Sequence, residues 1–311
     1  FKVVAVEPLP RTYGHLIEFL GETHEVVPFA YDWRISLEDE AQRLADRMLV
    51  ELDRVEQTNQ PIRILAHSMG GLLMRALLAF RPEVWQRICR HPDARVLMLG
   101  TPTRGSHSIT SVFAGQEALI NMLAAVDFCN SKAEILATIA RFPGVLELLP
   151  DSRSIDADAG EASLLDARVW REISAGARGG GTEPDAATLE GAAVVRHSIA
   201  QARFDPARLI YVAGRADETP IDFAIDKDGL SFVATNQGDG RVPWKTGIPA
   251  DAAEVYYLDA VHGDMADAGD AFAAFVEILQ SGKTSRLPAQ PPAGARGLPR
   301  RRLMPVREVQ G

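Results

Sequence analysis

Ser68 is the residue whose neighbours most clearly favour catalysis. It lies in the run Ala66-His67-Ser68-Met69-Gly70, which has small residues two places before and two places after the serine. This spacing is typical of a nucleophile elbow, a sharp turn between a strand and a helix that holds a serine hydroxyl exposed. The run therefore predicts Ser68 as a nucleophile and the Met69 N–H as a donor to an oxyanion. The alternative is an ordinary strand, turn and helix with a capping serine.

A serine nucleophile on such a scaffold needs an acid and then a histidine later in the chain. Of the seven histidines, only His262 follows a late predicted strand and precedes a final helix. The candidate acids are Asp217, Asp222, Asp226, Asp228 and Asp239. Asp239 is preferred because it lies between two glycines in a tight turn that can aim its carboxylate, although a plain Asp-Gly turn is the alternative. Asp264 is better explained as a negative charge at a helix N-terminus.

Two further groups of residues lie near these positions. His67 adjoins the nucleophile, but its side chain should point away from that of Ser68, so we expect a supporting role. In the loop Tyr31-Asp32-Trp33-Arg34 we favour a structural arrangement over substrate contact. There Asp32 and Arg34 would form a buried, hydrogen-bonded brace and Trp33 would belong to the core.

Apolar strands and amphipathic helices should position these side chains. Strands are predicted over residues 1–6, 25–29, 62–66, 95–100, 209–214 and 254–258. The helix that follows Ser36 carries apolar residues on one face and begins with a capping box formed with Asp39. Strands alternating with helices predict the α/β class, with a mainly parallel, doubly wound sheet. The active site of such a sheet lies at the carboxyl ends of its strands.

The alternation of strands and helices stops after residue 105, and this change divides the chain into segments. Helical patterns without a clear strand occupy residues 118–126, 133–139, 164–173 and 187–202. We therefore expect a first core segment over 1–104, a helical cap inserted at 105–205, and a second core segment over 206–280. The second segment should contain a hairpin near Asp228-Gly229 and a closing helix over 266–279. Residues 281–311 contain five prolines and seven basic residues against one acidic residue, which predicts a disordered basic tail.

Composition narrows the function classes. The 311 residues are 46% hydrophobic and 24% charged, which is ordinary for a globular protein, and the net charge of −9 disfavours nucleic acid as a partner. Cys89 and Cys129 are too few for a disulfide framework or a metal site, so we expect a reducing, cytoplasmic compartment. No apolar run is long enough to span a membrane, and no signal peptide is visible. Because the sequence begins with Phe1, it could be part of a longer polypeptide.

Taken together, the motifs resemble the lecithin:cholesterol acyltransferase family of α/β-hydrolases. The resemblance spans about residues 25–265 and rests on Tyr31-Asp32-Trp33-Arg34, Ala66-His67-Ser68-Met69-Gly70-Gly71, Leu99-Gly100-Thr101-Pro102, Gly238-Asp239-Gly240-Arg241-Val242-Pro243 and His262-Gly263. It implies an α/β-hydrolase fold, a triad of Ser68, Asp239 and His262, acyl-ester chemistry on lipids, and a cap that shapes the acyl site. The sequence departs from the family in two ways. It has no clear match to the Pro-Gly loop that gives the second oxyanion donor, and it lacks the paired lid cysteines of the secreted animal members.

The expected function is therefore that of a serine hydrolase acting on carboxylic esters, above all lipid or other long-acyl esters. Its acyl-enzyme would be released to water or to an alcohol, as in a lipase, a phospholipase or an O-acyltransferase. We expect no metal or cofactor, and peripheral membrane contact through the cap. The alternative from another class is a non-catalytic α/β-hydrolase-fold interaction domain of a larger protein, which would need none of the three catalytic side chains.

Overall fold

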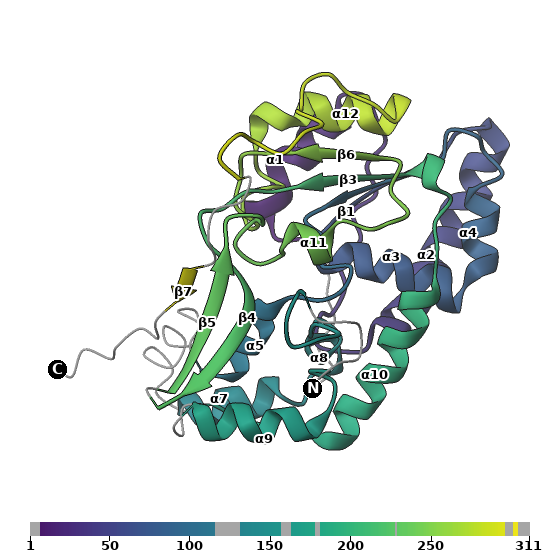
Figure 1. Cartoon of the computed structure of the whole chain (residues 1–311). Coiled ribbons are helices and arrows are strands. Elements are labelled where there is room, and N and C mark those ends of the chain that lie inside the picture. The colour runs from purple at the N-terminus through teal and green to yellow at the C-terminus, as the bar shows by residue number, and fades with distance from the viewer. Residues whose placement is uncertain are drawn as a thin grey trace.

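Four parallel strands form the central sheet of the computed structural model, which describes residues 7–115, 131–156, 163–177, 181–227, 229–295 and 301–303 (Figure 1). The strands lie side by side in the order β1 (Arg63–His67), β2 (Arg95–Leu99), β3 (Leu209–Ala213) and β6 (Glu254–Tyr257). Each strand pairs in parallel with the next. Their carboxyl ends therefore meet at one edge, and the loops that follow them gather there.

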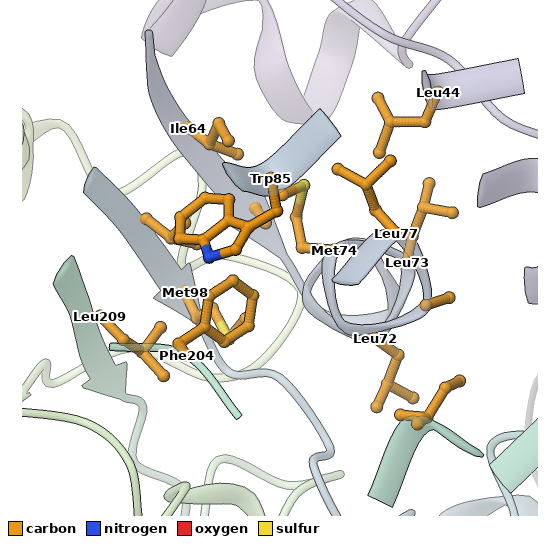
Figure 2. Packing of buried hydrophobic residues seen from close by; sticks show 14 of the residues in the cluster. Leu44, Ile64, Leu72, Leu73, Met74, Leu77, Trp85, Met98, Phe204 and Leu209 are labelled. Carbon is orange, nitrogen blue, oxygen red and sulfur yellow. The ribbon is translucent and has the colours of Figure 1, made fainter. Parts of the chain in front are cut away.

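Helices cover both faces of this sheet. One face packs against α2 (Leu37–Val55), α3 (Met69–Phe80) and α4 (Pro82–Ile88), and the other against α1 (Pro10–Gly21) and α12 (Phe272–Ser281). Successive residues of β2 alternate between the two hydrophobic clusters, which is why the strand is apolar along its whole length. Figure 2 shows the first cluster, where the ring of Trp85 packs edge-on against that of Phe204 at 4.9 Å between ring centroids. The predicted α/β class, with a parallel sheet covered by helices on both faces, is confirmed.

The cap is built from helices and one hairpin. Its helices are α5 (His107–Phe113), α7 (Lys132–Ile139), α8 (Pro143–Leu146), α9 (Ala167–Gly176) and α10 (Ala186–Gln201). The predicted hairpin is present as β4 (Thr219–Asp226) paired with β5 (Gly229–Thr235), although Asp228 lies outside the described residues. Phe223 and Phe232 of the hairpin share one hydrophobic cluster with Phe113 and Trp170. The hairpin therefore packs with the cap, although it lies beyond the 105–205 range expected for it.

Short elements complete the described chain. They are η1 (Glu56–Thr58), η2 (Pro206–Arg208), α11 (Trp244–Gly247), η3 (Gly269–Ala271) and β7 (Arg301–Leu303). The helix expected over 118–126 and the strand expected over 1–6 lie outside the described residues.

Two predicted elements differ from the structure. Residues 25–29 are extended but form no strand, because Pro28 cannot donate to a ladder and Val27 is 36% exposed instead of packed in a sheet. The closing helix begins at Phe272 and not at residue 266, since turns and η3 fill the interval. Asp264 lies exposed in those turns, so its assignment to a helix N-terminus was wrong.

The C-terminal segment also differs from the prediction, because its described part packs against the core. Leu287 packs on the cluster beneath α12, and the Tyr257 N–H donates to the Pro288 carbonyl at 2.9 Å. Gln237 Nε2 donates to the Ala295 carbonyl at 2.6 Å, and β7 pairs antiparallel with β5. The disordered tail predicted from composition is therefore wrong over residues 283–295 and 301–303. Main-chain hydrogen bonds hold much of this segment, and they depend little on side-chain composition.

Deleting residues 283–311 should destabilise the protein. Each lost hydrogen bond is worth about 1 kcal/mol, and 1 kcal/mol shifts the melting temperature of a large domain by about 2–4 °C. We expect a decrease of about 5 °C or more, because at least three such bonds and the packing of Leu287 are removed together. Thermal denaturation followed by circular dichroism measures this decrease in melting temperature. Deleting only 304–311 removes none of these contacts and serves as the control; equal melting temperatures for the full chain and the 283–311 deletion would contradict the structure.

Candidate active site

Ser68 lies in a strained turn between β1 and α3. Its backbone angles are φ 56° and ψ −126°, a region that side-chain-bearing residues rarely adopt. A Cβ added at Gly70 would lie 3.8 Å from the Ala66 Cβ, an ordinary contact, whereas a Cβ at Gly71 would overlap the side chain of Thr101. The turn therefore leaves least space at Gly71, whereas the elbow pattern places its second small residue at Gly70.

The three predicted catalytic side chains form one hydrogen-bonded row. Ser68 Oγ lies 2.7 Å from His262 Nε2, and His262 Nδ1 lies 2.8 Å from Asp239 Oδ2. Because the carboxylate only accepts, Nδ1 carries the proton and Nε2 accepts from the serine hydroxyl. Asp239 is 1% exposed and His262 8% exposed, so water is largely excluded from the pair.

The turn around Asp239 aims its carboxylate at the histidine. Its second oxygen, Oδ1, accepts from the N–H groups of Arg241 and Val242 at 2.9 and 2.7 Å. The Asp239 main-chain carbonyl accepts from the His262 N–H at 2.8 Å. Both carboxylate oxygens are therefore occupied, and the aspartate holds the histidine through its main chain as well as its side chain.

None of the other candidate acids described by the structure binds His262 Nδ1 in place of Asp239. Asp217 is exposed, and the side chain of Asp222 accepts from the neighbouring Phe223 N–H at 2.7 Å. The side chain of Asp226 and all of Asp228 lie outside the described residues. Among the described candidates, the structure brings Asp239 to His262.

Two glycines at strand ends make room for the buried pair, and the sequence analysis had given neither a role. A Cβ on Gly100, whose φ is 55°, would lie 2.9 Å from Asp239 Oδ2 and 3.2 Å from His262 Nδ1. A Cβ on Gly214 would lie 2.8 Å from the Asp239 Cβ. The signal in the sequence was a glycine directly after an apolar strand and before a polar loop, at both positions.

Gly100→Ala should therefore damage activity more than stability. The added methyl group must displace the Asp239–His262 pair, and a displacement of about 1 Å costs on the order of 100-fold in rate. Gly191 is the matched control, because a Cβ there meets nothing within 4 Å in helix α10. We expect the kcat of Gly191→Ala to equal that of the wild type and the kcat of Gly100→Ala to be much lower. Equal kcat values for both variants would show that the glycine makes no room for the pair.

Met69 is the first residue of α3, directly after the nucleophile. The first N–H groups of a helix have no partner within the helix, and the helix dipole favours negative charge there. A Cβ on Gly144 of α8 would lie 3.1 Å from the Met69 methyl carbon, so the cap packs directly against this end of α3.

The loop Tyr31-Asp32-Trp33-Arg34 contains the expected hydrogen-bonded brace, although it is half-buried and not buried, and it lacks the expected core tryptophan. Arg34 Nε and Nη2 donate to Asp32 at 2.7 and 2.6 Å, and these bonds hold the pKa of the Asp32 carboxyl below its usual value. Trp33 is 50% exposed, so its assignment to the core was wrong. Its ring packs edge-on against Phe142 of the cap, with ring centroids 5.8 Å apart.

Most described apolar residues of the cap near this loop have structural roles. The buried ones are Leu136 and three members of the cap cluster, Val145, Leu146 and Leu149. Four other apolar candidates, Ile120, Leu123, Val126 and Phe128, lie outside the described residues. Phe142 is only partly buried and, with Trp33, leaves apolar surface on the side where α8 meets Met69.

His67 contacts the histidine and not the serine side chain. Its Nε2 lies 2.9 Å from the His262 carbonyl oxygen, and its Nδ1 lies 2.9 Å from the Tyr13 hydroxyl. Burial, reinforced by the neighbouring His262, lowers the pKa of His67 to about 4. His67 is therefore neutral at physiological pH.

Comparison with known proteins identifies the family of the chain. A model of the lecithin:cholesterol acyltransferase family matches residues 13–172, just over half of the chain. Uncharacterized protein YJR098C of Saccharomyces cerevisiae is 29% identical over 96 residues, which are 31% of this chain and only 13% of the yeast protein.

Solved structures of a bacterial lipase also align with the chain. The mature form of Bacillus licheniformis lipase BlEst2 matches with a TM-score of 0.34 and 14% identity, over 79% of this chain and 75% of the lipase. Its propeptide form matches with a TM-score of 0.36 and 12% identity, over 79% of this chain and 41% of that one. Separately, none of the helices in the described ranges is long and apolar enough to cross a membrane.

Proposed function

Because the chain belongs to the lecithin:cholesterol acyltransferase family, we propose that it is a serine hydrolase that cleaves carboxylic esters through an acyl-enzyme. The observation that carries this proposal is the row Ser68–His262–Asp239, whose two hydrogen bonds measure 2.7 and 2.8 Å. Three side chains from loops far apart in the sequence meet with the donor and acceptor pattern that nucleophilic catalysis requires.

The proposed reaction follows from this pattern. Ser68 Oγ attacks the ester carbonyl while its proton passes to His262 Nε2, and Asp239 stabilises the imidazolium that forms. The Met69 N–H donates to the oxyanion of the tetrahedral intermediate. His262 then gives its proton to the leaving alcohol, which leaves the acyl group on Ser68. Water or a second alcohol, deprotonated by His262, releases the acyl group.

We propose lipid or other long-acyl esters as the substrates, with the acyl chain in contact with Trp33 and Phe142. These two rings pack together and connect the core to α8, which in turn packs against Met69. The exposed Trp33, packed on Phe142, supplies apolar surface for an acyl chain and for peripheral contact of the cap with a membrane. We also propose that the protein is cytoplasmic, because it has only two cysteines. Cys89 is a free thiol, and Cys129 lies outside the described residues.

The chain-length profile of p-nitrophenyl esters tests this substrate class. Each buried methylene contributes about 0.8 kcal/mol, about fourfold in kcat/KM, so the value should rise from acetate to a maximum at about eight carbons or more. Trp33→Ala should lower kcat/KM for the long esters and leave acetate nearly unchanged. Val194→Ala, which shortens another exposed apolar side chain, on α10, is the control. Values that fall steadily from acetate, measured below micelle formation, would exclude long-acyl esters.

A further inference from the structure

His67 and Ser68 are consecutive residues, and both bind His262. Ser68 binds the imidazole Nε2 at 2.7 Å, whereas His67 binds the main-chain carbonyl of the same residue at 2.9 Å. The two rings lie 5.1 Å apart between centroids. The β1–α3 turn therefore holds His262 at two points, one on its side chain and one on its main chain.

The hydrogen-bond chemistry fixes how His67 is protonated. A carbonyl oxygen only accepts, so His67 Nε2 must carry a proton and donate it. His67 Nδ1 is then the acceptor in the neutral ring and receives the Tyr13 hydroxyl proton at 2.9 Å. Burial raises the pKa of the Tyr13 hydroxyl, which keeps that proton in place. Tyr13, His67 and the His262 carbonyl thus form a chain in which every donor has an acceptor.

The residues on either side of His262 are exposed. Val261 is 46% exposed, and a Cβ on Gly263 would meet nothing within 4 Å. The His262 N–H is held by the Asp239 carbonyl at 2.8 Å. The bond from His67 holds the other end of the same residue, so its loss would remove one restraint on the position of the His262 ring relative to Ser68.

We propose that His67, oriented by Tyr13, is a positioning residue that fixes the main chain of His262 relative to Ser68. This inference rests on the proposed function, because it assigns His67 a role only if His262 acts as the base. A neutral His67 also avoids placing a second positive charge beside the imidazolium that forms on His262 during the reaction.

Variants of His67 test the inference through kcat and KM. His67→Phe removes the donor and should lower kcat by about 10- to 100-fold, with KM changed by less than about twofold, because the loss acts on the geometry of the transition state. His67→Gln can place an amide N–H near the same carbonyl and should recover most of kcat. Tyr13→Phe should lower kcat by up to about tenfold, the equivalent of one hydrogen bond.

His107 provides the matched control. Like His67, it is a histidine whose Nε2 lies 2.9 Å from a main-chain carbonyl, in this case that of Arg153, and burial lowers its pKa to about 4. His107→Phe should lower the melting temperature about as much as His67→Phe while keeping wild-type kcat. For the tyrosine, Tyr256→Phe removes a buried hydroxyl that accepts from the Thr284 N–H, away from His262.

The outcomes separate this inference from the proposed function. An inactive wild-type protein, unlabelled by a fluorophosphonate, would overturn both. An active wild type with unchanged kcat in His67→Phe would overturn the positioning role alone. Equal losses in His67→Phe and His67→Gln, or a kcat loss in His107→Phe as large as that in His67→Phe, would also overturn it. Should His67→Phe fail to fold, the kcat values of His67→Gln and Tyr13→Phe relative to Tyr256→Phe decide the question.

Discussion

Replacing Ser68 with alanine is expected to lower kcat for ester hydrolysis by about 10⁶-fold, the order seen when a serine hydrolase loses its nucleophile. The Ser68 Oγ is the atom that would carry the acyl group, and no neighbouring hydroxyl is bonded to His262 Nε2 in the described structure. The substitution removes one oxygen atom from a half-buried side chain, so we expect the protein to fold normally. Steady-state turnover of a p-nitrophenyl ester measures the loss, and circular dichroism checks the fold.

Two further variants make this result specific. His262→Ala should fall to a similar level, because the members of a triad act as a unit and their losses do not add. Ser198→Ala is the control, since it removes a serine hydroxyl that donates to the Val194 carbonyl within α10, far along the chain from the site. Turnover close to wild type in Ser68→Ala or in His262→Ala would show that the catalytic assignment is wrong.

Replacing Asp239 with asparagine is expected to lower kcat by about 10⁴-fold, as in the serine proteases. The amide can donate to His262 Nδ1, which would place the imidazole proton on Nε2 and block its acceptance of the Ser68 proton. In that orientation the amide oxygen still accepts from the Val242 N–H, which now donates to Oδ1 of the carboxylate at 2.7 Å, so the turn should be retained. The rate of p-nitrophenyl ester hydrolysis is the measurement.

The matched substitution is Asp217→Asn, because Asp217 is an exposed candidate acid that follows β3. It should keep near wild-type kcat, as should Asp222→Asn, whose carboxylate is engaged by its own neighbour. A severe loss in Asp217→Asn beside an active Asp239→Asn would transfer the role of the acid to Asp217.

The site was predictable from sequence because its residues are tied to the elements that precede them. Ser68 follows β1 and His262 follows β6, and parallel strands bring their carboxyl ends to one edge whatever the loops contain. Asp239 is less constrained, because it follows the β4–β5 hairpin and not a strand of the central sheet. Its choice rested on the flanking glycines, and the turn they allow does aim the carboxylate at His262.

The features that sequence did not predict depend on contacts between distant segments. Nothing local shows that Trp33 meets Phe142 at the surface, or that Phe223 and Phe232 of the hairpin pack into the cap. The C-terminal segment is held by partners such as Tyr257 and Gln237, which its own composition cannot reveal. The roles of Gly100 and Gly214 likewise follow from what lies next to them, the buried Asp239–His262 pair.

Labelling with a fluorophosphonate tests most directly the claim that this is a serine hydrolase. The reagent phosphonylates a serine only when a neighbouring base activates its hydroxyl, so it separates a catalytic triad from a hydrolase fold used only for binding. The wild-type protein should be labelled stoichiometrically, with the modified peptide containing Ser68, and His262→Ala should label far more slowly. A folded wild-type protein that is not labelled, or is labelled at another serine, would contradict the account.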